Sequence, residues 1–468
     1  MDSVWLPALV AALMALANAY GLELPVYWSY VGIGAIATFL ARDMRALIPI
    51  ACCSYCCISM ENNPASNVEG SLFYQTDFVV QLATMIVIAA VLLVGRLVFR
   101  FATPAGGVKL PKFSFGFLAL GLSFVLGGMF SGYYSGRTAF FGFVEICCLA
   151  ALYFYFYFTV DWKTVPKWYV AAVFALFGVG IFLEVVNIYL SVDVIVDGQI
   201  CRSKIFTGWG HYNNMGCVMA MGTMAFLCLA AIFRHGWIFS VFSVGMMAGV
   251  VMTQSRGAIL FAGITYVIGA ILVLLYSAGR DKRLNFLVFD AALILFIFLV
   301  VLLRDRLDIL FGSMPDDFFE GNGRWPIYKG GIDQFFEAPA FGVGFYECHG
   351  FRWGNLPEGA FLPARYHNTY IQLIASGGVF AAIAYLFHRA QTVRLLLARP
   401  SAEKSMLAVI ILALLLTSFV DCHFFNLGPG LLYSVVLIGI EGADLRDSAK
   451  FSAKNNKKIQ NNKFSCSF

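Results

Sequence analysis

Residues 78–99 read FVVQLATMIVIAAVLLVGRLVF, an almost wholly apolar stretch with one charged side chain, Arg96. A helix needs about 20 such residues to cross the hydrocarbon core of a bilayer. The rest of the chain has the same character, because 60% of its 468 residues are hydrophobic and 13% are charged. A soluble domain is about 25% charged. The sequence therefore predicts an all-α, polytopic transmembrane helical bundle.

The same length and hydropathy criteria predict fourteen candidate spans in the whole chain, of which twelve to fourteen are expected to cross the bilayer. The first lacks a small-residue cleavage site, so we interpret it as a retained helix. We expect residues 1–446 to form the transmembrane domain and residues 447–468 a polar, basic, cytoplasmic tail. The candidate spans are 4–18, 26–40, 45–60, 78–99, 113–131, 139–159, 168–190, 213–233, 237–254, 257–278, 285–303, 367–388, 405–420 and 427–441.

Basic residues predict the orientation, because Lys and Arg accumulate in short cytoplasmic loops. With both termini in the cytoplasm, the inside segments hold 22 of the 32 basic residues, sixteen of them up to Lys404 and six from Arg446 to Lys463. The outside loop 61–77 holds none. The net charge of +5 follows from this bias and from the tail, so no nucleic-acid partner is implied.

One long segment, 304–366, interrupts the regular alternation of spans and short loops. It lies on the predicted outer side, and long loops of this kind are usually functional or disordered. Tyr328 and Ile332 follow one another at helical spacing, Pro326 suits a first turn and Pro339 ends the pattern. We therefore expect a short helix in this extracytoplasmic loop.

Two sets of residues would suggest a metal, and neither is interpreted as a metal site. Residues 52–57 read CCSYCC within an apolar span, where cysteines act as small packing residues, and a second pair across a folded segment is missing. The adjacent acids Asp316 and Asp317 resemble solvated loop surface.

Three arginines on the predicted outer side point to an anionic ligand. Arg202 lies in the loop 191–212, Arg256 in a tight turn between two spans, and Arg324 at the start of the predicted loop helix. Each could simply anchor to lipid headgroups. The turn at Arg256 is so short, however, that the side chain must lie at the membrane boundary, where ionisable residues usually face a protein-lined cavity. Arginine binds phosphate with two hydrogen bonds and stays charged.

A histidine at the start of a predicted span is the candidate general base. His367 opens the span 367–388, where the positive end of the helix dipole favours the neutral imidazole that a base requires. His211, His349 and His423 also fall on the outer side and remain alternatives. Arginines with a base at this surface suggest a phosphorylated, lipid-linked substrate.

Four stretches, in this order, resemble motifs of the bacterial O-antigen ligase and polymerase family, over about residues 200–380. Arg202 lies farther before the first stretch than the family arginine does, and Lys204 is a rival for its role. The stretches are GWGHYN at 208–213, TQSRGA at 253–258, Gly323-Arg324 followed by APAFGVGF at 338–345, and HNTYIQ at 367–372 with Gly377.

The resemblance implies a GT-C-like, metal-independent membrane glycosyltransferase of the cytoplasmic membrane, without a cofactor. It would transfer a glycan from undecaprenyl pyrophosphate to an acceptor hydroxyl of a glycan or glycolipid, in contact with membrane lipids. Arg256, Arg324 and Arg202 would bind the pyrophosphate, and His367 would accept the acceptor proton.

Two alternatives stay open. The first is a polymerase that joins lipid-linked repeat units. The second is a transporter or flippase of the same lipid-linked glycan, which would place its ionisable residues within the spans. Glu145, Glu184 and Asp290 lie within spans but are scattered along the chain, so the sequence favours the enzyme.

Overall fold

The computed structural model describes residues 3–59, 76–102, 109–196, 198–302, 304, 324–345 and 366–465. Their structure is almost entirely helical, with one two-stranded hairpin. The elements are α1 (Trp5–Tyr20), α2 (Glu23–Leu40), α3 (Leu47–Cys53), η1 (Ser54–Cys56), α4 (Thr76–Ala102), α5 (Ser114–Val125), α6 (Gly136–Thr159), α7 (Tyr169–Ser191), β1 (Ile195–Val196), β2 (Gln199–Ile200), η4 (Arg202–Lys204), α8 (Tyr212–Ile232), α9 (Trp237–Met252), α10 (Arg256–Tyr276), α11 (Gly279–Leu302), α13 (Arg324–Glu337), α14 (Thr369–Ala398), α15 (Ala402–Thr417), η6 (His423–Phe425) and α16 (Leu427–Ser465).

Each candidate span coincides with helical structure, which confirms the predicted all-α polytopic fold. Among the described residues, eight helices are long and apolar enough to cross a membrane, namely α4, α6, α7, α8, α10, α11, α14 and α16. The predicted loop helix is also present as α13.

The bundle is built around α8, which packs against α7, α9, α10 and α15. Nearly every residue of α8 is buried, whereas α4 and α11 are largely exposed and apolar. A helix that is apolar on all sides is stable only inside a protein or in lipid, so α4 and α11 form the lipid-facing rim. Small residues bring the central helices close: a Cβ atom on Gly178 of α7 would lie 3.0 Å from the Cα atom of Gly222 in α8.

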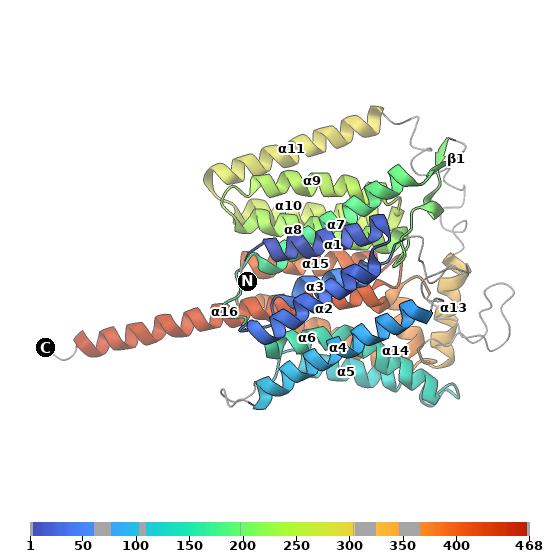
Figure 1. The fold of residues 1–468 in the computed structure, drawn as a ribbon, viewed down its shortest axis with the longest axis horizontal. Helices are drawn as coiled ribbons and strands as arrows, with labels where there is room; N and C mark the ends of the chain where they lie inside the picture. The colour runs from blue at the N-terminus through green and yellow to red at the C-terminus, as the bar shows by residue number, and fades with distance from the viewer. Residues whose placement is uncertain are drawn as a thin grey trace.

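The bundle helices lie roughly parallel, and α13 crosses them at one end, the end at which the hairpin strand β1 also lies (Figure 1). We call this the α13 end. Both chain termini are drawn toward the opposite end, where the last turns of α16 project beyond the bundle (Figure 1). An even number of crossings between the termini explains this arrangement.

The third candidate span, 45–60, differs from a regular membrane helix. Only α3 and η1 are helical, and the chain then continues to Ser59 without helical structure. It still crosses the bundle: Arg45 bonds Thr164 at the opposite end, and Ile58 accepts a hydrogen bond from the backbone of Gly208 at the α13 end. All four cysteines of this span are buried.

Helix α14 is also not a single straight span. Gly378 has φ 63° and ψ −160°, which interrupts the helical backbone. The rings of Tyr370 and Tyr385, on either side of the break, lie 6.1 Å apart. The chain therefore folds back at Gly378, so the predicted span 367–388 consists of a short segment at the α13 end and a longer one.

The segment after α13 fastens this reversal. Backbone amides of Val343 and Gly344 donate to the carbonyls of Ala375 and Ser376 at 2.9 Å each. Gly342 has φ 66°, and a Cβ atom there would lie 2.4 Å from the Ser376 carbonyl carbon. Only glycine fits such a contact at positive φ. This junction holds α13 against the start of α14.

Candidate functional site

Helices α8, α10 and α14 begin at the α13 end, and each has a side-chain cap. His211 caps α8 by accepting a hydrogen bond from the Asn213 amide at 3.1 Å. Ser255 caps α10, and Asn368 caps α14 by accepting from two backbone amides. The N-terminal ends of these helices therefore meet near one another, and each carries a partial positive charge of about half a unit.

Asp421 lies between these helix ends, in the turn that links α15 to η6. One carboxylate oxygen, Oδ2, accepts a hydrogen bond from Nδ2 of Asn213 at 3.0 Å and lies 3.6 Å from Nε2 of His211. The other, Oδ1, accepts from the Cys422 amide at 2.8 Å and lies 3.4 Å from Nδ1 of His367. The side chain is only 5% exposed. A buried carboxylate thus connects two histidines.

Asp421 is ionised at neutral pH. Burial raises the pKa of this carboxyl group and is the largest single influence, whereas the interaction with His367 lowers it. The nearby imidazoles of His423 and His211 lower the pKa further, so it lies well below the usual range of an aspartate.

His367 presents its ring between Asp421 and the solvent. An N–H at Nδ1 directed at the carboxylate leaves the lone pair on Nε2, the arrangement that a general base needs. The side chain is 31% exposed, so the ring is accessible. The backbone has φ 47°, which is uncommon for a residue other than glycine and often marks a functional position.

The turn that holds His367 is fastened on two sides. The Tyr328 hydroxyl of α13 donates to the His367 carbonyl at 3.3 Å. On the other side, Nδ2 of Asn368 donates to the Phe419 carbonyl at 3.0 Å, and the Thr369 amide donates to Ser418 at 2.9 Å. These contacts explain how an unusual backbone conformation persists.

His211 is placed differently from His367. Its Nδ1 accepts the Asn213 amide, so the neutral ring carries its proton on Nε2, which faces Asp421. Partial burial lowers the pKa of His211, Asp421 opposes this, and His367 and Arg324 lower the pKa further. Both ring nitrogens are engaged, so His211 is less suited to accept a proton than His367 is.

The three predicted arginines fall on this same cluster. Arg256 is the first residue of α10, and its charge interacts with that of Arg202. The guanidinium of Arg202 lies 5.6 Å from the centre of the Tyr212 ring, and that ring lies 5.2 Å from the ring of His211. The rival Lys204 instead donates to the backbone carbonyl of Asp193 at 2.7 Å.

Arg324 of α13 is the third arginine of the cluster. It is the first residue of α13, and its side chain interacts with the hydroxyl of Tyr328, which contacts the turn of His367. Its positive charge also acts on His211. The structure thus brings Arg202, Arg256 and Arg324, from η4, α10 and α13, to the same end of the bundle as His367, which lies in the turn before α14.

Sequence reasoning missed Asp421 and the linking role of Asn213. Asp421 is the acidic residue of the stretch SFVDCHFFN at 418–426, directly after a span on the predicted outer side. That position is a usable signal, because an acid at a span end beside apolar neighbours needs a partner. Asn213 bridges the carboxylate to Ser255, whose hydroxyl donates to Oδ1 of Asn213 at 2.8 Å.

The other outer histidines have different positions. His423 is buried in η6 and acts on Asp421, whereas His349 lies outside the described residues, as do Asp316 and Asp317. Within the described part of the chain, no group of three or more His, Cys, Asp or Glu is arranged to hold a metal ion.

The fold and this polar cluster define the class: an all-α, multi-pass membrane protein with a cationic site at one end of the bundle. Residues 241–386 match the family model described as O-antigen ligase. This match supports an O-antigen ligase assignment for that part of the chain and confirms the resemblance of the three motif stretches that it covers, whereas GWGHYN at 208–213 lies outside it. A search of curated proteins found no match.

The family match includes Arg256, Arg324 and His367, while Arg202, His211 and Asp421 lie outside it. The family match indicates a membrane function of O-antigen ligase or polymerase type, with lipid-linked glycans as substrates.

Proposed function

We propose that the chain transfers a glycan from undecaprenyl pyrophosphate to an acceptor hydroxyl at the outer face of the cytoplasmic membrane. The observation that carries the proposal is the arrangement of a His–Asp pair beside three arginines at one end of a membrane bundle. The acceptor is a hydroxyl of a glycan or glycolipid, which includes both ligation and polymerisation.

In the proposed reaction, the acceptor oxygen forms a bond to the anomeric carbon of the donor glycan. Nε2 of His367 takes the hydroxyl proton, and Asp421 stabilises the imidazolium that results. The bond between the anomeric carbon and the pyrophosphate oxygen breaks, and its electron pair leaves with undecaprenyl pyrophosphate.

Charge develops on the leaving pyrophosphate, and Arg256, Arg324 and Arg202 are the residues proposed to neutralise it. The N-terminal ends of α8, α10 and α14 add positive potential at the same end. Because the arginines and helix ends supply the charge neutralisation, the proposal includes no metal ion.

The orientation belongs to the same proposal and rests on the positive-inside distribution of basic residues. After removal of native cysteines, a cysteine at Asp193, which is exposed at the α13 end, should react with an impermeant maleimide in intact spheroplasts. Labelling only after permeabilisation would place the site in the cytoplasm.

The function is tested with the purified full chain in proteoliposomes that contain a fluorescent lipid-linked glycan. Addition of acceptor should give glycosylated acceptor and free undecaprenyl pyrophosphate in equal amounts. Movement of the donor between leaflets without any transfer product would instead support the transporter alternative.

A further inference from the structure

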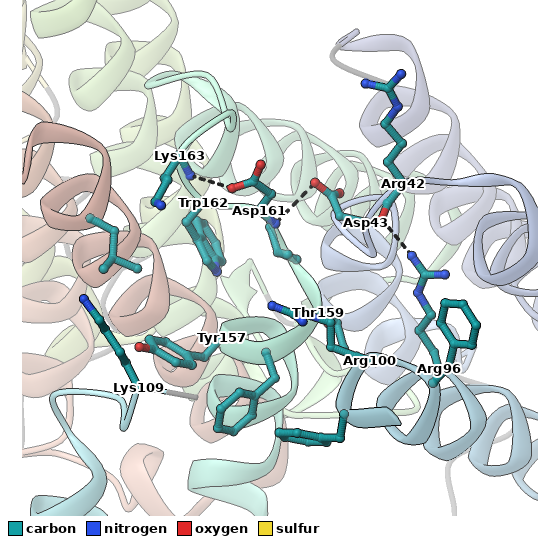
Figure 2. A pocket seen from close by; sticks show the side chains of 15 residues that line it. Arg42, Asp43, Arg96, Arg100, Lys109, Tyr157, Thr159, Asp161, Trp162 and Lys163 are labelled. Carbon is teal, nitrogen blue, oxygen red and sulfur yellow. Dashed lines mark hydrogen bonds between the residues drawn. The ribbon is translucent and has the colours of Figure 1, made fainter. Parts of the chain in front are cut away.

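A polar cavity lies far from the candidate site. It has a volume of about 550 Å³ and is formed where α2, α4 and α6 end. Basic side chains dominate its lining: Arg96 and Arg100 from the last turns of α4, Lys109 before α5, and Lys163 after α6. Arg42 also contributes, although its guanidinium points away from the other basic groups (Figure 2).

Helix α6 shows that this cavity is at the opposite end of the bundle. Its first turn, at Thr138, is close to Gly344 in the segment that follows α13, whereas its last residue, Thr159, lines the cavity. The helix has 24 residues, which at 1.5 Å each separates the two sites by about 36 Å. The cavity is therefore independent of the transfer site.

The acidic residues of the cavity do not cancel its positive charge. Asp43 already pairs with Arg45 at 2.6 Å. Besides Arg42, four basic side chains line the cavity, and Asp161 offsets the charge of one of them. The C-terminal ends of α2, α4 and α6 contribute about half a negative charge each. The cavity keeps an excess of about one to two positive charges, enough to attract a phosphate diester.

The walls beside this charge are apolar and face lipid. Phe99 and Phe101 are 61% and 49% exposed, and the Phe101 ring lies 5.2 Å from that of Phe158. From these phenylalanines toward the α13 end, α4 presents an exposed stripe of valines. Tyr157 lines the cavity as well, and tyrosine side chains favour the headgroup region of a membrane.

We propose that this cavity binds the headgroup of an anionic phospholipid, with its acyl chains along α4. A basic pocket between helices at the membrane boundary recognises a lipid phosphate, and the apolar stripe recognises the chains attached to it. A soluble phosphate compound would contact only the basic pocket and would leave the apolar stripe of α4 without a ligand. The lipid fastens α4 to α2 and α6 at the end of the bundle where α4 has few other buried contacts.

The test uses native mass spectrometry of the purified, delipidated full chain. Phosphatidylglycerol should bind at least tenfold more tightly than phosphatidylcholine with the same acyl chains, and more tightly than glycerol 1-phosphate. The double variant Arg100→Gln/Lys109→Gln changes two exposed side chains and should lose at least tenfold in phosphatidylglycerol affinity. Arg96 is left unchanged, because it bonds the carbonyls of Ala41 and Arg42.

Two further variants separate charge from folding. Arg100→Lys/Lys109→Arg keeps the charge and should bind phosphatidylglycerol within a few-fold of the native chain. Arg280→Gln/Arg283→Gln removes two exposed arginines from α11 at the same end and should leave binding unchanged. Equal affinity of the Arg100→Gln/Lys109→Gln variant and the native chain overturns the proposal. Equal affinity for glycerol 1-phosphate and phosphatidylglycerol also overturns it, since the ligand would then be a soluble anion.

Discussion

Nδ1 of His367 lies 3.4 Å from Oδ1 of Asp421, a buried carboxylate that follows α15 in the sequence. The two residues come from different helix connections, and the approach of α14 to α15 places them together. A carboxylate in this position holds the imidazole in the tautomer with a free Nε2 and stabilises its protonated form. The contact between His367 and Asp421 therefore predicts that replacement of the carboxylate lowers turnover.

Asp421→Asn should lower turnover by about 10²–10⁴, the usual contribution of general-base catalysis. The Michaelis constant for the donor should change little, because the substitution removes no positive charge. Steady-state kinetics in proteoliposomes measures both constants. Asp193→Asn, at an exposed position of the same end, is the matched control and should remain active. An Asp421→Asn enzyme within a few-fold of the native rate would contradict the proposed pair.

His367→Ala should also lose about 10²–10⁴ in rate. It should still fold and bind the lipid-linked donor, because the caps of α14 come from Asn368 and not from His367. Turnover normalised to bound donor is the measurement. His211→Ala and His423→Ala should have smaller effects on this ratio. If activity falls only in proportion to folded protein, His367 has a packing role and not a catalytic one.

Arg256→Ala and Arg324→Ala should abolish measurable transfer at unchanged protein levels. Lys at either position should recover activity poorly, at least tenfold below the native rate, because an ammonium group lacks the paired hydrogen bonds of a guanidinium. Initial rates at saturating acceptor measure the effect. Arg137→Lys, exposed in the first turn of α6 at the same end, is the control. Full activity of both Lys variants would favour anchoring to lipid headgroups.

The stability of the chain should fall as the pH drops below about 6.5, the ordinary pKa of histidine. The pKa of His211 is lowered in the folded chain, so below 6.5 the unfolded chain binds a proton that the folded chain excludes. The contribution of His211 to the free energy of unfolding is therefore complete above pH 6.5, and it is lost as the pH falls through the pKa of His211 in the folded chain.

His211→Gln should lessen this acid-induced loss, since glutamine keeps an acceptor for the Asn213 amide without titrating. The measurement is the midpoint of thermal unfolding between pH 8 and pH 5. His235→Gln, exposed at the opposite end, should retain the native pH dependence. If the midpoint of thermal unfolding depends on pH in the same way in the native chain and in His211→Gln, His211 does not contribute to the acid-induced loss of stability.

Gly342→Ala should destabilise the chain by about 1–3 kcal/mol, because it combines a positive φ with a Cβ atom pressed against backbone. Displacement of α13 relative to α14 should also lower turnover per folded molecule, since Arg324 and His367 lie on opposite sides of this junction. Thermal unfolding and kinetics measure the two effects. Gly263→Ala, with open space around it in α10, should be close to neutral.

Much of the fold could be predicted from the sequence because hydropathy is a local property. A run such as 78–99 must become helical in lipid wherever the rest of the chain lies, since its backbone polar groups have no other partners there. The short helix after Arg324, the tight turn at Arg256 and the span that opens at His367 were local predictions for the same reason, because hydropathy, prolines and turns act over a few neighbouring residues.

The details that depend on packing could not be predicted this way. The reversal at Gly378 follows from hydrogen bonds to the segment 338–345, which is distant in sequence. The third candidate span is mostly non-helical after Cys56, although its composition is that of a membrane helix.

Hydropathy along the sequence was enough to predict a multi-pass membrane protein, and the charged residues between the spans pointed to the arginines and the histidine that gather at one end. Tertiary packing places Asp421 beside His367, brings Arg202 rather than Lys204 close to Arg256, and directs Nδ1 of His211 to the Asn213 amide. Hydropathy and capping act between neighbours in the chain, whereas the contacts of Asp421 exist only once α8, α14 and α15 are packed together.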